Sequence, residues 1–231
     1  AIVPYLRNER GQTGVILVRT LHATGLGESA IGEILADLMA QANPTVGISA
    51  KQAQYELRIG AKADSREAAE ALVASAEAVV RERLGEHIIG DEPLAHTVVR
   101  RLRERGLSLA LHEGAAPAPV YRALSAVPGG VELLRGVILH PLDEPADEES
   151  TGSLARTSAI STRDRWRSAL ALSIQPASAP GPDGWTAVAA ALAHAGGVLE
   201  AGRRFDLSGD DAWDFVATFG LDLLWRYLAE S

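Results

Sequence analysis

The feature that most constrains the fold is an apolar run that ends in a loop of small residues, within 106–127. Leu107, Leu109 and Leu111 alternate with smaller or polar residues, which is typical of a short buried strand. The pattern breaks at 112–114, and a loop of small residues then leads to a helical segment. Open α/β sheets bind their ligands at the carboxyl ends of such strands. The sequence therefore predicts an α/β fold with a candidate site at 112–114.

Composition narrows the class of protein. The chain has 231 residues, of which 47% are hydrophobic, and a formal net charge of −8, so it can bury the core of one large or two small domains. No apolar run approaches the roughly 20 residues of a membrane-spanning helix, and no basic leader precedes an apolar stretch. The absence of cysteine removes disulfides, thiolate metal ligands and a Cys nucleophile. We therefore expect a cytoplasmic protein without a membrane partner, and the acidic balance argues against general nucleic-acid binding.

Residues 12–92 are expected to form a small α+β domain with the order β-α-β-β-α. A strand over 15–22 and a helix that ends at Asn43-Pro44 precede alternating apolar and polar residues over 46–63, the pattern of a half-buried antiparallel hairpin. Residues 64–67 resemble a capping box that opens a second helix. The expected sheet has three strands and two covering helices.

Residues 93–231 are expected to form a second α/β domain, a mixed sheet covered by helices. Its first helix is predicted to have Asp91 as N-cap and Pro93 in its first turn. The acidic segment 141–152 has few large apolar residues and is predicted to be an exposed loop. The remaining strands are expected over 137–140, 169–174 and 198–207, and the remaining helices over 120–127, 153–166 and 211–228. Residues 185–194 are Ala-rich and fit a helix by propensity alone, but the family resemblance described below implies a strand there.

The last helix carries more apolar surface than one buried stripe requires. Its apolar residues between 213 and 228 recur at the spacing of one helix face. Phe215 and Phe219 lie off that stripe, either as a second core contact or as part of an oligomer face, and Trp225 is a further large apolar residue of this helix. Large apolar side chains in excess of the buried face are typical of interaction surfaces. We therefore predict self-association, with a homodimer as the simplest closed form.

Several segments around Glu113 match the pattern of a known family. The matching positions are 105–110, Glu113, 123–124, 127–129 and 136–138. In this order they resemble the C-terminal domain of the CinA competence/damage-inducible family. The resemblance implies an α/β domain that deamidates nicotinamide mononucleotide (NMN), a nicotinamide-nucleotide amidohydrolase. It also implies a Ser nucleophile, which falls on Gly114 in this chain.

The other residues that the resemblance implies for this reaction are also replaced. They are a Tyr, a Lys, a glycine loop and an Arg, which fall on His140, near Pro145, on 175–177 and on Asp211. A general base must lie within hydrogen-bond reach of the hydroxyl that it activates, and Gly has no hydroxyl. We therefore expect that the domain has lost catalysis.

The first domain resembles the KH-like middle domain of the same family. The matching segments are 25–29, 35–38, 43–45, 56–58 and 61–63. A KH domain that binds RNA clamps the backbone with a GxxG loop, which is missing between the helices here, so Gly25 and Gly27 are interpreted as a tight turn. Residues 1–11 resemble the end of the family's N-terminal molybdopterin-binding-like domain, and we expect that domain to be absent.

One grouping of side chains could carry chemistry by itself. His112, Glu113 and His140 are predicted at one sheet edge, where a carboxylate and a His could perform acid–base work or two His and a carboxylate could hold a metal. The alternative that we favour is a degenerate pocket rim, because a catalytic base needs a nucleophile to act on. Ser173 is the nearby Ser at a strand end. The predicted residual pocket is therefore His112, Glu113, Gly114, His140 and Ser173, without a metal or cofactor.

Three functions remain open from the sequence. We favour a pseudoenzyme that keeps the amidohydrolase fold in order to bind a nucleotide-like small molecule or to assemble. The second is an active amidohydrolase whose catalytic residues have moved. The third is a nucleic-acid-linked role of the KH-like domain.

Overall fold

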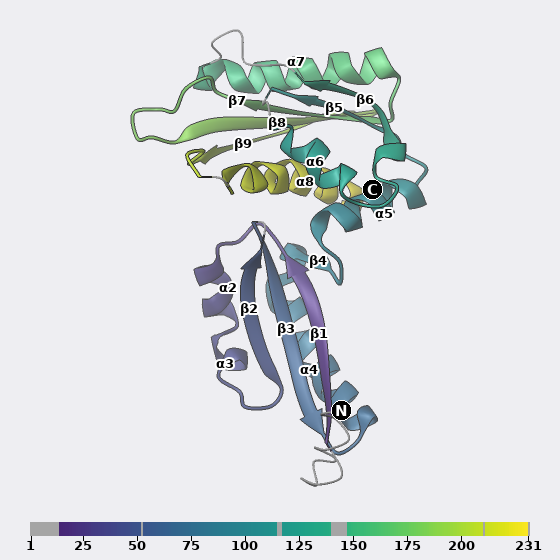
Figure 1. Cartoon of the computed structure of the whole chain (residues 1–231), viewed down its shortest axis with the longest axis vertical. Helices are drawn as coiled ribbons and strands as arrows, with labels where there is room; N and C mark the ends of the chain where they lie inside the picture. Colours follow the sequence, from purple (N-terminus) through teal and green to yellow (C-terminus); the bar gives the residue numbers. More distant parts are fainter. Residues whose placement is uncertain (1–13, 52, 115–116, 140–146, 210, 231) are drawn as a thin grey trace, which may run out of the picture. The chain divides into compact units, whose positions relative to one another are not determined.

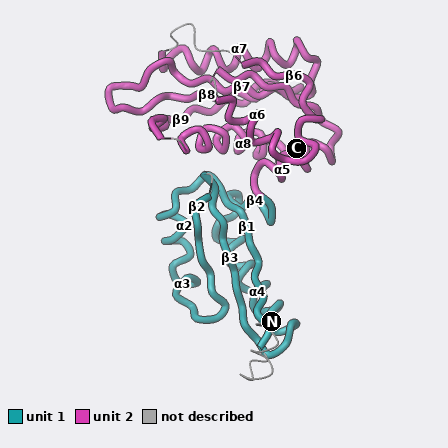
Figure 2. The backbone as a smooth tube through the Cα atoms, in the orientation of Figure 1, with its two compact units in different colours: residues 1–92 teal, residues 93–231 magenta. Residues whose placement is uncertain are grey.

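The computed structural model describes residues 14–51, 53–114, 117–139, 147–209 and 211–230. The chain separates into two compact units, Ala1–Glu92 and Pro93–Ser231 (Figure 2). Each unit has its own sheet, so the fold is mixed α/β with a small domain before a larger one, as the sequence predicts. Within the described residues, no helix is long and apolar enough to cross a membrane.

Unit 1 is a four-stranded antiparallel sheet with helices (Figure 1). Its elements are β1 (Val15–Ala23), α2 (Glu28–Ile34), α3 (Ala36–Met39), β2 (Thr45–Lys51), β3 (Gln54–Ala63), α4 (Arg66–Leu84), the short 3-10 helix η1 (Gly85–His87) and β4 (Ile88–Gly90). The strands lie in the order β2-β3-β1-β4. The predicted hairpin is confirmed, since β2 and β3 pair from Thr45 opposite Gly60 to Lys51 opposite Gln54.

One face of this sheet is buried and the other is open. Leu21 of β1 and Leu57 of β3 pack with Val80 of α4, and all three side chains are fully buried. Successive residues of a strand point to opposite faces, so Ile16 and Val18 of β1 lie on the other side, where they are 70% and 58% exposed.

Two element predictions for unit 1 are wrong. The sheet has a fourth strand, β4, which pairs with β1 through His22 and Gly90; three residues are too few to show an alternating pattern in the sequence. The first helix does not continue unbroken to residue 42, because Leu35 leaves the helical conformation with φ −105° and ψ 9° and separates α2 from α3.

The start of α4 lies within the predicted capping segment 64–67, whereas the start of α5 differs from the prediction. Ser65 is the N-cap of α4, and its Oγ accepts a hydrogen bond from the backbone N–H of Ala68 at 3.1 Å. The N-cap of α5 (Leu94–Glu104) is Pro93, which has no capping side chain. Asp91 is therefore not the cap that the sequence suggested, and it forms an ion pair with Arg81 at 3.1 Å instead.

Unit 2 is a five-stranded mixed sheet between two layers of helices (Figure 1). After α5 its elements are β5 (Leu109–Glu113), α6 (Pro119–Ser125), η2 (Val131–Leu133), β6 (Leu134–Leu139), α7 (Glu148–Trp166), β7 (Leu170–Pro176), β8 (Thr186–His194), β9 (Gly197–Phe205) and α8 (Ala212–Glu230). The strand order is β6-β5-β7-β8-β9, with parallel pairs up to β7 and antiparallel pairs after it. One face is covered by α7 and the other by α5, α6 and α8.

The described end of the acidic segment 141–152 is not a loop. Residues 148–152 form the first turn of α7, so the prediction is wrong there, and 141–146 lie outside the described residues. Asp147 is the N-cap, with its Oδ1 accepting from the backbone N–H of Ser150 at 2.9 Å. Carboxylates near a helix N-terminus are favoured by the helix dipole, which explains why an acidic stretch with few apolar residues begins a helix.

The three aromatic residues that the sequence assigned to an interface have different surroundings. Trp225 is only 4% exposed and belongs to the core of unit 2. Phe219 is half-buried and packs edge-on against Phe205 of β9, with ring centroids 5.6 Å apart. Phe215 is 50% exposed. Only the last of the three is therefore an open apolar side chain.

Candidate functional site

Four of the five predicted pocket residues lie near the carboxyl end of β5, on its two faces: His112, Glu113, Gly114 and Ser173. In the parallel pairing of β5 with β7, His112 lies opposite Ser173. Because neighbouring strand residues face opposite sides, His112 and Ser173 lie on the α7 side of the sheet, whereas Glu113 faces α6. Gly114 follows the strand, and its N–H donates to the carbonyl of Ile174 at 2.9 Å. The fifth member, residue 140, and the position near 145 lie outside the described residues.

Glu113 holds the start of α6. Its two carboxylate oxygens accept hydrogen bonds from the backbone N–H groups of Val120 at 2.9 Å and Tyr121 at 2.8 Å. These groups have no partner inside a helix, and the N-cap residue Ala118 has no side-chain acceptor to offer. Glu113 is completely buried, and burial raises its pKa to about 7, although the two N–H donors act in the opposite direction. The side chain thus has a clear positioning role for α6.

A side chain at position 114 would compete with Gln175 for space. A Cβ added at this glycine would overlap Oε1 of Gln175 and come within 3.0 Å of its Cδ. Gln175 is 2% exposed, and its Nε2 donates a hydrogen bond to Oγ of Ser173 at 3.1 Å. The amide of Gln175 therefore occupies the volume that a side chain at position 114 would need.

Ser173 is placed poorly for the role of a relocated nucleophile. It is completely buried, and its Oγ already accepts the hydrogen bond from Gln175. A nucleophile must reach a bound substrate and have a base within about 3 Å of its proton. His112, half-buried on the adjacent strand, is the register neighbour of Ser173.

The described carboxylates and His side chains of this region, which do not include residue 140, are not gathered around one point. Within the described part of the chain, no group of three or more His, Asp or Glu side chains is arranged to hold a metal ion. The carboxylate of Glu113 is directed to α6 and not to its neighbour in sequence, His112.

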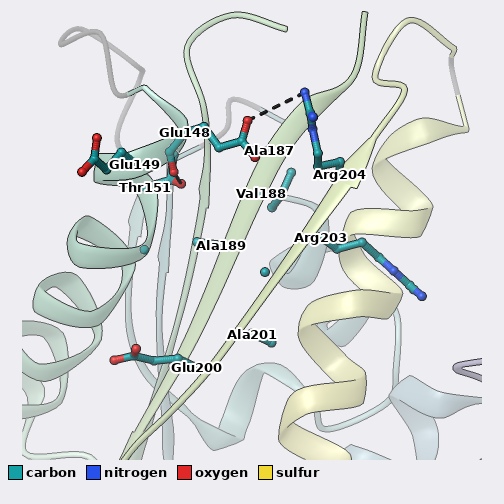
Figure 3. Close-up of a pocket in the computed structure, with 12 residues that line it drawn as sticks. Glu148, Glu149, Thr151, Ala187, Val188, Ala189, Glu200, Ala201, Arg203 and Arg204 are labelled. Carbon is teal, nitrogen blue, oxygen red and sulfur yellow. Dashed lines mark hydrogen bonds and ion pairs between the residues drawn. The ribbon is translucent and has the colours of Figure 1, made fainter. Parts of the chain in front are cut away.

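A cavity that the sequence did not predict lies on the same side of the sheet, between the first turn of α7 and the β8–β9 hairpin (Figure 3). Its volume is about 450 Å³. The floor is made of small residues, Ala187 and Ala189 of β8 and Gly202 of β9. A Cβ added at Gly202, or at Gly152 of α7, would meet no other atom within 4 Å. The space exists because the side chains around it are small.

Charged side chains stand at the two ends of this cavity. Arg204 of β9 points toward α7 (Figure 3), where its guanidinium lies 3.7 Å from Glu148, and it also contacts Asp183 at 2.8 Å. At the other end, Glu200 forms an ion pair with Arg156 of α7. The cavity therefore has an apolar floor and a rim on which opposite charges are already paired.

A second cavity of about 510 Å³ adjoins the first and shares Glu148 and Ala187 with it. It is lined mainly by residues 177–182, which follow β7. This is the loop region in which the resemblance places a ligand-binding glycine loop, so the loop lies beside open space although most of its glycines are replaced.

A signal for the first cavity is present in the sequence. In β8, the residues facing α7 are all Ala, at 187, 189, 191 and 193, and the last three pack against Ala155 and Ala159 of α7. Small residues along one face of a strand indicate close approach of the covering helix or an unfilled volume. The sequence does not show which of the two applies.

The comparisons with known proteins agree with this architecture. Residues 18–90 match the model of the damage-inducible protein CinA KH domain. A CinA-like protein of Parasynechococcus marenigrum is 37% identical over 138 residues, which are 59% of this chain and 33% of the relative. A CinA-like protein of Dictyoglomus turgidum is 35% identical over 141 residues, 60% of this chain and 34% of the relative. More than half of the chain is thus similar to CinA-like proteins.

Solved CinA structures share the fold of a large part of the chain. A CinA superfamily protein of Klebsiella pneumoniae superposes with a TM-score of 0.50 at 19% identity, covering 60% of this chain and 97% of that one. A competence/damage-inducible protein of Agrobacterium tumefaciens gives a TM-score of 0.50 at 18% identity, with 59% and 94% covered. The chain spans about a third of the length of the curated relatives that it matches.

Proposed function

We propose that this CinA-family chain combines a KH-like domain with an amidohydrolase-like domain that has lost catalysis and serves binding or homodimeric assembly. The observation that carries the proposal is the pair formed by Gly114 and Gln175. Gly114 stands where the resemblance implies the Ser nucleophile, and the buried amide of Gln175 fills the adjacent volume. Removing a nucleophile typically costs several orders of magnitude in rate.

The alternative of a relocated catalytic centre rests on Ser173. Its position opposite His112 favours it, because a Ser and a His on adjacent strands can form a nucleophile–base pair. Its complete burial and its hydrogen bond from Gln175 oppose it. We therefore keep it as the alternative that the assay must exclude.

A nucleic-acid role of the KH-like unit receives less support. The junction between α2 and α3 consists of Leu35 alone, so the described helices leave no room for a GxxG clamp. Gly25, with φ 81°, lies in the turn between β1 and α2 instead. A titration with single-stranded RNA at several salt concentrations tests this role, since phosphate contacts give a steep salt dependence.

The binding half of the proposal concerns a nucleotide-like small molecule. The two adjoining cavities near Glu148 provide about 450 and 510 Å³ on the α7 side of the sheet. Pockets that hold small molecules have volumes of roughly 300–1,000 Å³. Calorimetric titration with NMN and its deamidated product measures whether this volume is used.

The decisive test of catalysis is ammonia release from NMN by the purified chain. We expect no release from the wild type or from Gly114→Ser, because the new Ser would collide with Gln175. A Ser-bearing CinA amidohydrolase serves as the positive control. Ammonia release by the wild type that disappears in Ser173→Ala would refute the proposal and establish the relocated centre.

A further inference from the structure

β9 is the open edge of the unit 2 sheet. It is nine residues long, and among the described strands only β8 pairs with it. Six of its nine residues are exposed. The outward backbone groups of an unprotected edge strand are a template for pairing with another strand. The opposite edge, β6, is shorter, with six residues, and the ring of Trp166 lies directly against its Gly136.

An apolar stripe of α8 flanks this edge. Phe215, Phe219, Leu223 and Tyr227 are spaced four residues apart and lie on one helix face. Phe219 contacts Phe205 at the end of β9, and Tyr227 contacts His194 of β8. Phe215 is 50% exposed, and the exposed Leu199 of β9 lies on the same α8 side of the sheet. The edge is thus open on its backbone and partly apolar on one flank.

The other flank of β9 carries complementary charges. Glu200, Gly202 and Arg204 alternate along the α7 side of the strand, with a negative and a positive residue equally distant from a glycine. If two β9 strands pair antiparallel about Gly202, Glu200 of each copy stands opposite Arg204 of the partner subunit. Opposite charges directly across two strands stabilise the pairing, and like charges destabilise it.

We propose that the edge of β9 binds a second copy of this chain, antiparallel, with Gly202 at the two-fold axis. The two sheets then continue into one, and the apolar stripes of the two α8 helices approach each other on one side. A symmetric contact of this kind uses the same surface on both copies and closes as a dimer. A stable interface buries about 800 Å² on each partner. One strand edge is too narrow to bury that area, so the apolar stripe of α8 must contribute to the interface.

The internal partners of the two charged residues do not prevent this pairing. Glu200 with Arg156, and Arg204 with Asp183, remain 45% and 38% exposed in their own copy. Each can therefore meet a second opposite charge across the interface. The proposal rests on the assembly half of the proposed function and is independent of the loss of catalysis.

The test measures the dimerisation constant of the full chain by sedimentation equilibrium. Glu200→Arg and Arg204→Glu each place like charges opposite one another, and we expect each to weaken the dimer by about tenfold or more. Mixing the two variants restores opposite charges at both positions of a heterodimer, so the mixture should recover the wild-type constant. Arg135→Glu on β6, the other edge of the same sheet, is the matched control and should leave dimerisation unchanged.

The outcomes separate the interface from assembly in general. Recovery in the mixture supports the β9 interface even if each variant alone is slightly less stable. The mixture contains the same two variants, so any loss of folding stability is present in both measurements and only the pairing of charges differs. A wild-type dimer that neither charge reversal weakens overturns this interface and leaves assembly through another surface, such as the exposed Ile16 and Val18 of unit 1. A wild-type chain that stays monomeric at micromolar concentration overturns the β9 interface and also the assembly half of the proposed function.

Discussion

Two regions on the α7 side of the same sheet, the Gly114–Gln175 pair and the cavity under the first turn of α7, differ in what fills them. At the first, the buried amide of Gln175 occupies the space beside a glycine. At the second, a strand away, Ala189 lies opposite Gln175 in register, and the floor of Ala and Gly leaves about 450 Å³ unfilled. The two regions thus differ in the volume of the side chains that face α7.

This difference separates what positions the elements from what fills the space between them. β5 and α6 are placed by apolar packing and by the two hydrogen bonds of Glu113. A single long polar side chain, Gln175, fills the space beside Gly114. The open volume on this side of unit 2 therefore lies next to Gly114 and not at it.

The largest expected effect tests Glu113, which precedes Gly114 in the chain and holds the start of α6. Its folded-state pKa of about 7 lies above the ordinary value of 4.5, so the folded chain binds this proton more tightly than the unfolded chain. The stabilisation is complete below pH 4.5 and is lost as the pH rises through 7, which amounts to about 3 kcal/mol. Denaturant unfolding of the wild type and of Glu113→Gln at pH 4.5, 6 and 8 measures the difference in their free energies of unfolding at each pH.

The wild type should lose stability relative to this variant over that pH range, since other carboxylates titrate equally in both proteins. A relative stability that rises with pH would mean that the N–H groups of Val120 and Tyr121 outweigh burial. It would place the folded-state pKa of Glu113 below 4.5.

The sequence predicted the strands and helices of both units well where periodicity extended over several turns or residues. It could not show β4, which is too short for a pattern, or the start of α7, where an acidic segment is ordered by the cap of Asp147. For the site, the sequence predicted that His112, Glu113 and Gly114 lie at the end of a strand, and β5 ends there. The contact of Gly114 with Gln175 was not predicted, because it joins residues on two strands and depends on where one rotamer points.

The second prediction adds a methyl group to each region in turn, beginning with the filled one. Gly114→Ala should destabilise the chain by about 1–3 kcal/mol, since overpacking displaces a buried side chain and Gln175 must give up its bond to Ser173. In a Gln175→Ala background the same substitution should cost far less. A double-mutant cycle of thermal unfolding gives the coupling, and a coupling of zero would show that the two residues do not compete for the same space.

The smallest effect is expected in the open region. Gly152 lies within α7, and a Cβ there meets nothing within 4 Å, so Gly152→Ala should stabilise the chain by about 0.5–1 kcal/mol through reduced backbone entropy of the unfolded state. Gly32→Ala in α2 is the matched control, because it also adds a methyl group to a helix without a nearby atom but lies in unit 1. Both should raise the melting temperature. Only Gly152→Ala, at a residue that lines the cavity, should weaken the binding of a ligand there. Equal effects of Gly152→Ala and Gly32→Ala on binding would place that ligand elsewhere.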